Sequence, residues 1–201
     1  MIKNEIAPGI VLYDDVIKNV EKLHLDIEEG MLSAGLTWMP AGVKEDKDNG
    51  DDYINKESRD TLTIGIPYSP VIKDDYENLS SAFFTTLSNI FLEGFDPIEK
   101  DYKRTYGFET TWHDIHGILK YGVGQKFINH IDDHISYHRR ISTVYYINDD
   151  YQGGEILFPR FNISVKPKAN QMIVFPSTYV YNHSVLPVTE GTRYAVVSWL
   201  K

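Results

Sequence analysis

The second half of the chain alternates apolar and polar residues with a period of two, and this pattern constrains the fold more than any other feature. Alternation of this kind is typical of strands with one buried face. Turn sequences such as residues 148–150 and 152–154 separate successive segments. The predicted strands span residues 110–121, 126–130, 140–147, 154–159, 163–165, 172–175, 179–185 and 193–200. Short, closely spaced strands predict a sandwich or a barrel.

The first half of the chain indicates helices that flank these strands. Residues 6–13 predict a first strand, and Asp14 or Asp15 would cap a helix that runs to about residue 31. Residues 61–66 predict another strand, and residues 76–93 carry an apolar stripe with helical spacing. The fold class expected is therefore mostly β with N-terminal flanking helices, an α+β arrangement.

A length of 201 residues is enough for one well-buried core, so a single domain over residues 1–201 is expected. Residues 1–100 would supply helical support and outer strands, and residues 101–201 the β core with the candidate site. Residues 40–60 are polar and charged, which predicts a solvated loop. That loop is either a plain connection or a lid over a site.

Composition excludes several classes of protein. The formal net charge of −9 argues against a general nucleic-acid binder, because phosphate binding relies on clustered Lys and Arg. The absence of cysteine excludes disulfides, thiolate metal sites and a cysteine nucleophile. The N-terminus lacks the apolar segment of a signal peptide, and no stretch is apolar enough to span a membrane. A cytoplasmic location is therefore expected, with no membrane partner.

His130 and Asp132 form a His-x-Asp triplet on a predicted strand, and His183 lies on a later one. Residues two apart on a strand share a face, so His130 and Asp132 can bind one ion, with His183 as a third ligand. Two imidazoles and one carboxylate suit non-haem Fe(II) and leave three of its coordination positions open. Zn(II) can be bound by the same ligands. Arg193, ten residues after His183, adds a cation for an anionic cofactor.

Three residues close in sequence, Asp133, His134 and His138, are alternatives to these ligands. His134 would share a helix face with His130 if this segment were helical, which would make a different two-histidine site. His113 and His116 lie on another predicted strand, on opposite faces, and are expected to be surface or partly buried residues. An isolated histidine on a strand is more often structural than a metal ligand.

Around these residues the chain resembles the prolyl 4-hydroxylase branch of the Fe(II)/2-oxoglutarate-dependent dioxygenases. The resemblance covers residues 121–199 and rests on ordered sequence blocks. These blocks are YGVGQKFINHID (121–132), RRISTVYYIN (139–148), GGEILFP (153–159), VKPKANQMIVFP (165–176) and HSVLPVTEGTR (183–193).

The resemblance implies a distorted double-stranded β-helix, a jelly-roll or cupin-like barrel, with iron bound by His130, Asp132 and His183. It implies that Arg193 binds the far carboxylate of 2-oxoglutarate, because a guanidinium can bond both oxygens. Tyr121 and Tyr146 match residues that contact or line the cofactor pocket, although both could be plain core aromatics.

Arg139 or Arg140 falls near a position at which relatives place an arginine that faces the substrate. Adjacent strand residues point in opposite directions, so only one of them can face the pocket. Arg139 is the preferred candidate, and a surface charge without a role in binding is the alternative.

The implied activity is hydroxylation of a prolyl residue in a peptide or protein, with Fe(II), 2-oxoglutarate and dioxygen, and with ascorbate as a candidate reductant. The acidic chain favours a basic or neutral peptide. Two alternatives stay open: the same chemistry on a free amino acid or other small molecule, and a non-catalytic cupin-like metal-binding protein. The sequence does not indicate the oligomeric state.

Overall fold

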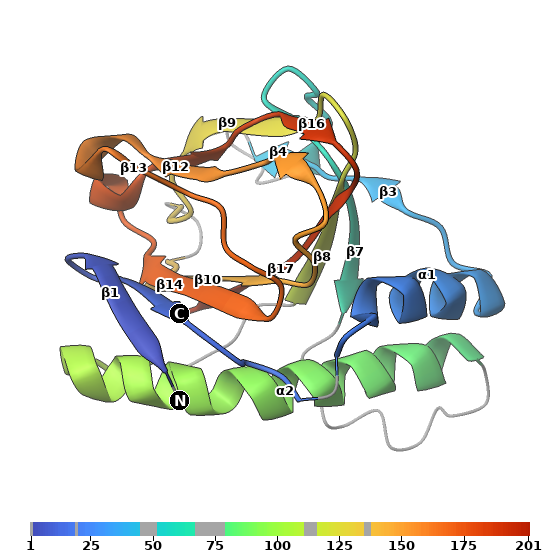
Figure 1. The fold of residues 1–201 in the computed structure, drawn as a ribbon, viewed down its shortest axis with the longest axis horizontal. Coiled ribbons are helices and arrows are strands. Elements are labelled where there is room, and N and C mark those ends of the chain that lie inside the picture. The colour runs from blue at the N-terminus through green and yellow to red at the C-terminus, as the bar shows by residue number, and fades with distance from the viewer. Residues whose placement is uncertain (1, 19, 45–51, 67–78, 111–115, 135–137) are drawn as a thin grey trace.

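The computed structural model describes residues 2–18, 20–44, 52–66, 79–110, 116–134 and 138–201. Within these ranges, two antiparallel sheets face each other and two α-helices lie against the outer side of the larger sheet (Figure 1). The predicted arrangement of flanking helices followed by a β core is therefore correct.

The larger sheet has eight strands, and strands distant in sequence are neighbours in it. The N-terminal hairpin pairs with a late strand, for example, in the register Leu12 to Ile173. In spatial order the strands are β1 (Lys3–Ala7), β2 (Ile10–Tyr13), β14 (Gln171–Pro176), β10 (Ile141–Tyr146), β17 (Arg193–Leu200), β8 (His116–Tyr121), β7 (Leu62–Ile66) and β3 (Met39–Pro40).

The smaller sheet lies on the side of the larger sheet away from the helices (Figure 1). Its strands in order are β13 (Ile163–Val165), β12 (Ile156–Phe158), β15 (His183–Val185), β9 (Lys126–His130) and β6 (Arg59–Asp60). Two short pairs and two single 3-10 turns complete the described structure. These are β11 (Gln152–Gly153) with β16 (Val188–Glu190), β4 (Val43–Lys44) with β5 (Asp52–Tyr53), and the turns Pro159–Phe161 and Tyr179–Tyr181.

Helix α2 (Leu79–Tyr106) runs along the larger sheet, and α1 (Leu23–Ser33) lies beside it (Figure 1). The sequence pattern predicts an end near residue 93, and this prediction is wrong. The apolar stripe continues through the buried residues Phe95, Ile98 and Tyr102. Burial of large apolar side chains contributes about 1.5–3 kcal/mol each. That gain offsets the helix-disrupting effect of Pro97, which lies inside the helix.

Three local predictions at element ends are also wrong. Residues 6–13 form parts of two strands, because Pro8-Gly9 makes a turn in which Gly9 has a φ of 73°. The first helix starts at Leu23, not near Asp14 or Asp15. Asn170 holds the preceding segment in a non-helical, bent conformation, since its side chain accepts a hydrogen bond from the Ile17 N–H and donates one to the Ile17 carbonyl. Residues 179–181 form a 3-10 turn before β15 begins.

Some predictions fall partly outside the described residues. These are the centre of the 40–60 loop, the start of the second helix and the start of the strand predicted from residue 110, together with His113. Among the described helices, none combines the length and apolar character needed to cross a bilayer.

Candidate metal centre

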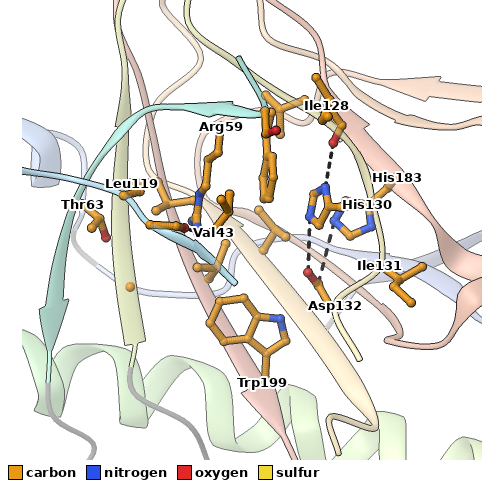
Figure 2. Close-up of a pocket in the computed structure, with 18 of the residues that line it drawn as sticks. Val43, Arg59, Thr63, Leu119, Ile128, His130, Ile131, Asp132, His183 and Trp199 are labelled. Carbon is orange, nitrogen blue, oxygen red and sulfur yellow. Dashed lines mark hydrogen bonds and ion pairs between the residues drawn. The ribbon is translucent and has the colours of Figure 1, made fainter. Parts of the chain in front are cut away.

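His130, Asp132 and His183 come together between the two sheets. His130 is the last residue of β9 and pairs in register with His183, the first residue of β15. The His130 Nε2 lies 3.3 Å from Asp132 Oδ1, and the His183 Nε2 lies 3.8 Å from Asp132 Oδ2 (Figure 2). One ligand atom from each residue lies within 4.8 Å of the other two. The three groups are therefore close enough to contact one ion.

Both imidazoles are oriented by backbone carbonyls. The Nδ1 of His130 lies 2.9 Å from the carbonyl oxygen of Ile128, and the Nδ1 of His183 lies 3.1 Å from that of Tyr181. A carbonyl only accepts hydrogen bonds, so each Nδ1 carries the proton. The lone pair of each Nε2 then faces Asp132, which is the tautomer that a metal-binding histidine needs.

The carboxylate of Asp132 is held in its ionised form. Burial raises the pKa of Asp132, but His183, His130 and Ser142 together outweigh burial and lower it well below its usual range. The Ser142 hydroxyl donates to Asp132 Oδ2 over 2.6 Å and also lies 2.8 Å from the Ser177 hydroxyl. These serines fix the carboxylate and leave its charge intact.

His183 is neutral at pH 7. Burial and the neighbouring His130 lower the pKa of His183 to about 4, although Asp132 opposes the shift. The His183 ring packs edge-on against Phe175, while His130 stacks on Phe127 with ring centroids 3.6 Å apart. A neutral, rigidly packed imidazole is suited to bind a metal ion.

The alternative histidines do not form a competing site among the described residues. His134 follows the end of β9 and does not share a helix with His130. His116 was expected near the surface, and this expectation is wrong: it is fully buried and packs edge-on against Phe95 and Phe91 on the helix side of the larger sheet.

A cavity of about 650 Å³ opens beside the metal centre, between the two sheets. Arg193 lines the same cavity and is 1% exposed. It pairs in register with Tyr121, and its guanidinium carbon lies 4.9 Å from the ring centroids of both Tyr121 and Tyr146. Burial disfavours the Arg193 cation, but the phenol groups of Tyr146, Tyr151 and Tyr121 outweigh burial and raise its pKa.

The surroundings of Arg193 fit a carboxylate. Its Nε and Nη1 are buried and have no acceptor among the described residues, and the hydroxyls of Tyr121, Tyr146 and Tyr151 likewise form no hydrogen bond there. Polar groups buried without partners are costly, so a bound anion would satisfy several of them together. Gly154 leaves the space open: it has a φ of 68°, and a Cβ there would lie 3.0 Å from Arg193 Cδ.

The remaining residues predicted for the site differ in whether they line the cavity. Tyr121 lines the cavity, whereas Tyr146 packs behind Arg193 in the apolar cluster around Phe158. Arg139 lines the cavity with its guanidinium carbon 3.6 Å from the centroid of the Trp199 ring. Arg140 is exposed, and its guanidinium donates to the Glu109 carbonyl.

Sequence reasoning missed several residues of this site, among them Ser142, Tyr151 and Trp199. Ser142 carries a signal, since it is a small polar residue at a fully buried position of a strand that contains only one other aliphatic polar residue, Thr143. Tyr151 lies in a turn, where no periodicity indicates a direction. Burial raises the pKa of the Tyr151 phenol to about 12, so it is a neutral group beside Arg193.

Comparison with known proteins matches residues 116–201 to the model of the 2OG-Fe(II) oxygenase superfamily. Human Prolyl 3-hydroxylase 2 is 41% identical over 66 residues, which cover 30% of this chain and 9% of that protein. The chain spans less than half the length of the curated relatives it matches.

Two solved structures share the fold over almost the whole chain. A Pseudomonas putida prolyl-4-hydroxylase aligns with a TM-score of 0.69 at 18% identity, covering 96% of this chain and 92% of that one. A Trichoplax adhaerens prolyl hydroxylase, in complex with a hypoxia inducible factor oxygen degradation domain peptide fragment, aligns with a TM-score of 0.68 at 16% identity. That alignment covers 96% and 83% of the two chains. The expected double-stranded β-helix fold and the family resemblance are confirmed.

Proposed function

We propose, from the match of residues 116–201 to the 2OG-Fe(II) oxygenase superfamily, that the chain hydroxylates a prolyl residue in a peptide or protein. One observation carries the proposal. Two histidines and one carboxylate converge on a cavity that also contains a buried arginine without an acceptor among the described residues. We further propose that residues 1–201 act as a single unit, in which the helices support the β core.

In this proposal His130, Asp132 and His183 hold Fe(II) on one flank, and Arg193 binds the far carboxylate of 2-oxoglutarate. Bound together with dioxygen, these cofactors supply the oxidising power for hydroxylation of a C–H bond. The protein orients its ligands through the Ile128 and Tyr181 carbonyls. The apolar walls around Leu119 and Val197 keep water away from the centre.

The peptide substrate is supported by the complex of the Trichoplax adhaerens enzyme with a peptide fragment. The position of hydroxylation on the ring is a separate question, since the human relative is named a prolyl 3-hydroxylase and the Pseudomonas putida structure a prolyl-4-hydroxylase. We propose that Arg139, on Trp199 at the cavity wall, contacts the substrate.

The test is an assay with Fe(II), 2-oxoglutarate, ascorbate and oxygen, in parallel with proline-containing peptides and with free L-proline. The expected result is succinate together with a peptide that gains one oxygen atom, and NMR of the product then gives the ring position. Oxidation of free proline alone would support a small-molecule substrate. An absence of succinate in every arm would support a non-catalytic metal-binding protein.

A further inference from the structure

We propose that Arg59 binds a carboxylate of the substrate, and that the chain therefore acts on proline next to an anionic group. The group is either an acidic side chain beside the target proline in a peptide or the α-carboxylate of free proline. This inference rests on the proposed function and names its substrate class.

Arg59 lies on β6, the edge strand of the smaller sheet, and lines the same cavity as His130 and Asp132 (Figure 2). Two contacts fix its half-buried side chain. The guanidinium carbon lies 4.8 Å from the ring centroid of Phe127, and Nη1 donates to the Gly42 carbonyl over 2.9 Å. Neither partner carries a negative charge, so the cation is positioned but not neutralised.

Two acids of the described part of the chain, one next to Arg59 in sequence and one in the lining of the same cavity, have other partners. Its sequence neighbour Asp60 accepts a hydrogen bond from Gln125 over 3.0 Å. Asp133 accepts one from the backbone N–H of Arg139 and lies 3.6 Å from His138. Within the described residues Arg59 has no ion-pair partner, and its buried Nε has no acceptor. A partly desolvated cation with unused donors favours an anion that enters the cavity.

This anion is distinct from the one proposed for Arg193. Arg193 belongs to the larger sheet and is enclosed by phenol groups, whereas Arg59 belongs to the opposite sheet. In Figure 2 the Arg59 side chain extends toward Val43, away from His183. Because Arg193 can bind both oxygens of the cofactor's far carboxylate, Arg59 is available to the substrate.

The larger sheet supplies two glycines and apolar side chains to the wall of the same cavity. Gly65 on β7 and Gly117 on β8 pair in register, and both line the cavity. Neither contributes a side chain, while Leu119 and Trp199 supply apolar surface. An apolar ring next to a carboxylate matches these surroundings. The net charge of −9 led to the expectation of a basic or neutral peptide. Net charge is a property of the whole chain, whereas the charge that a substrate meets in the cavity depends on local residues such as Arg59.

The experiment compares matched substrates that differ by one charge. The peptide arm uses acetylated, single-proline peptides with aspartate or asparagine on either side of the proline. The small-molecule arm uses L-proline against L-prolinamide. In the wild-type protein kcat/KM should be about tenfold or more higher for the carboxylate member, a fold-change that corresponds to about 1.4 kcal/mol. Binding to the Zn(II)-loaded protein, measured by calorimetry, should show the same preference without turnover.

Variants assign that preference to Arg59. In Arg59→Gln the preference should fall to about one, while the KM for 2-oxoglutarate stays the same. Arg59→Glu should favour a lysine peptide over the aspartate peptide. Arg104→Gln is the matched control, since Arg104 is an exposed arginine on α2, on the other side of the larger sheet from the cavity, and it should keep the wild-type preference.

The outcomes separate the two proposals. Equal kcat/KM for the charged and neutral wild-type substrates would overturn the role of Arg59 while leaving prolyl hydroxylation intact, and this result needs no variant to fold. A raised KM for 2-oxoglutarate in Arg59→Gln would overturn it in favour of a cofactor contact. If no substrate is oxidised, the proposed function fails. In that case the role of Arg59 is judged from calorimetry alone, and equal binding of the carboxylate substrate and its neutral counterpart would overturn it.

Discussion

The two faces of the larger sheet differ in how their polar groups are satisfied. On the helix face the Tyr102 hydroxyl donates to the Gly9 carbonyl, and the Tyr194 hydroxyl donates to Glu28. On the cavity face the Nε and Nη1 donors of Arg193 lack acceptors among the described residues. Arg193 and Tyr194 are adjacent on β17, so one strand serves both faces. The comparison teaches that packing against the helices stabilises the fold, while the cavity face keeps unsatisfied groups for ligands.

The largest expected effect is on the cavity face. Asp132→Ala should abolish turnover, because the ion loses its carboxylate ligand, while the fold is retained since the helix face is untouched. Turnover assays measure the loss of activity and circular dichroism checks that the fold is retained. Asp149→Ala, at an exposed position, is the control. Full activity in the variant would remove the metal centre from the proposal.

On the helix face, Phe95→Ala should have the opposite effect: it should lower stability and leave the metal centre unchanged. Phe95 is 1% exposed and packs 5.5 Å, ring to ring, from Phe91 and from Tyr145. Its truncation should lower the free energy of unfolding by about 3–5 kcal/mol, through lost burial and a cavity. Denaturant titration measures this loss, and metal affinity of the folded protein should not change. Exposed Tyr179→Ala should have little effect. A comparable loss there would break the contrast.

Arg193→Met should weaken 2-oxoglutarate binding without destabilising the protein. A charge-assisted hydrogen bond contributes about 1.5–3 kcal/mol, which predicts roughly a tenfold to hundredfold loss of affinity. Because Arg193 Nε and Nη1 are buried without acceptors among the described residues, replacing the cation by an apolar side chain should leave the thermal midpoint of the cofactor-free protein unchanged or higher. Calorimetry tests the binding and thermal melts test the stability, with the exposed Arg104→Met on α2 as the control. A clearly lower midpoint would show that Arg193 is structural.

The smallest effect concerns Glu28, which links α1 to the sheet. Its carboxylate accepts hydrogen bonds from Lys120, Tyr194 and Trp38. Burial raises the pKa of Glu28, but these donors outweigh burial and lower it below 4.5. The ionised Glu28 carboxylate therefore stabilises the folded protein by about 0.2–1 kcal/mol. This contribution is complete above the pKa of a glutamate in the unfolded chain and is lost as the pH falls through the lowered pKa of the folded protein.

Thermal midpoints of wild type and Glu28→Gln are measured from neutral pH down to a pH below the lowered pKa of Glu28. The two midpoints should differ at neutral pH and converge in acid. Glu29→Gln, an exposed neighbour on the same helix, is the matched control. A difference that grows toward low pH would contradict the sign of this contribution.

The sequence predicted the strands of the β core well, because period-two alternation persists where one face is buried. It also predicted that His130, Asp132 and His183 would meet. Element ends were predicted poorly. The start of α1 depends on the side chain of Asn170, far along the chain, and the end of α2 depends on tertiary burial around Pro97. Arg59 was not predicted as a site residue, because its strand is two residues long and carries no periodicity.

The adjacency of Arg193 and Tyr194 also affects how the chain can misfold. A slip of β17 by one residue would turn the phenol into the cavity and the guanidinium against the helices. Such a slip would lose the attachment of α1 through Glu28 as well as the candidate anion site. One strand register therefore sets both the attachment of the first helix through Glu28 and the position of Arg193 at the candidate anion site.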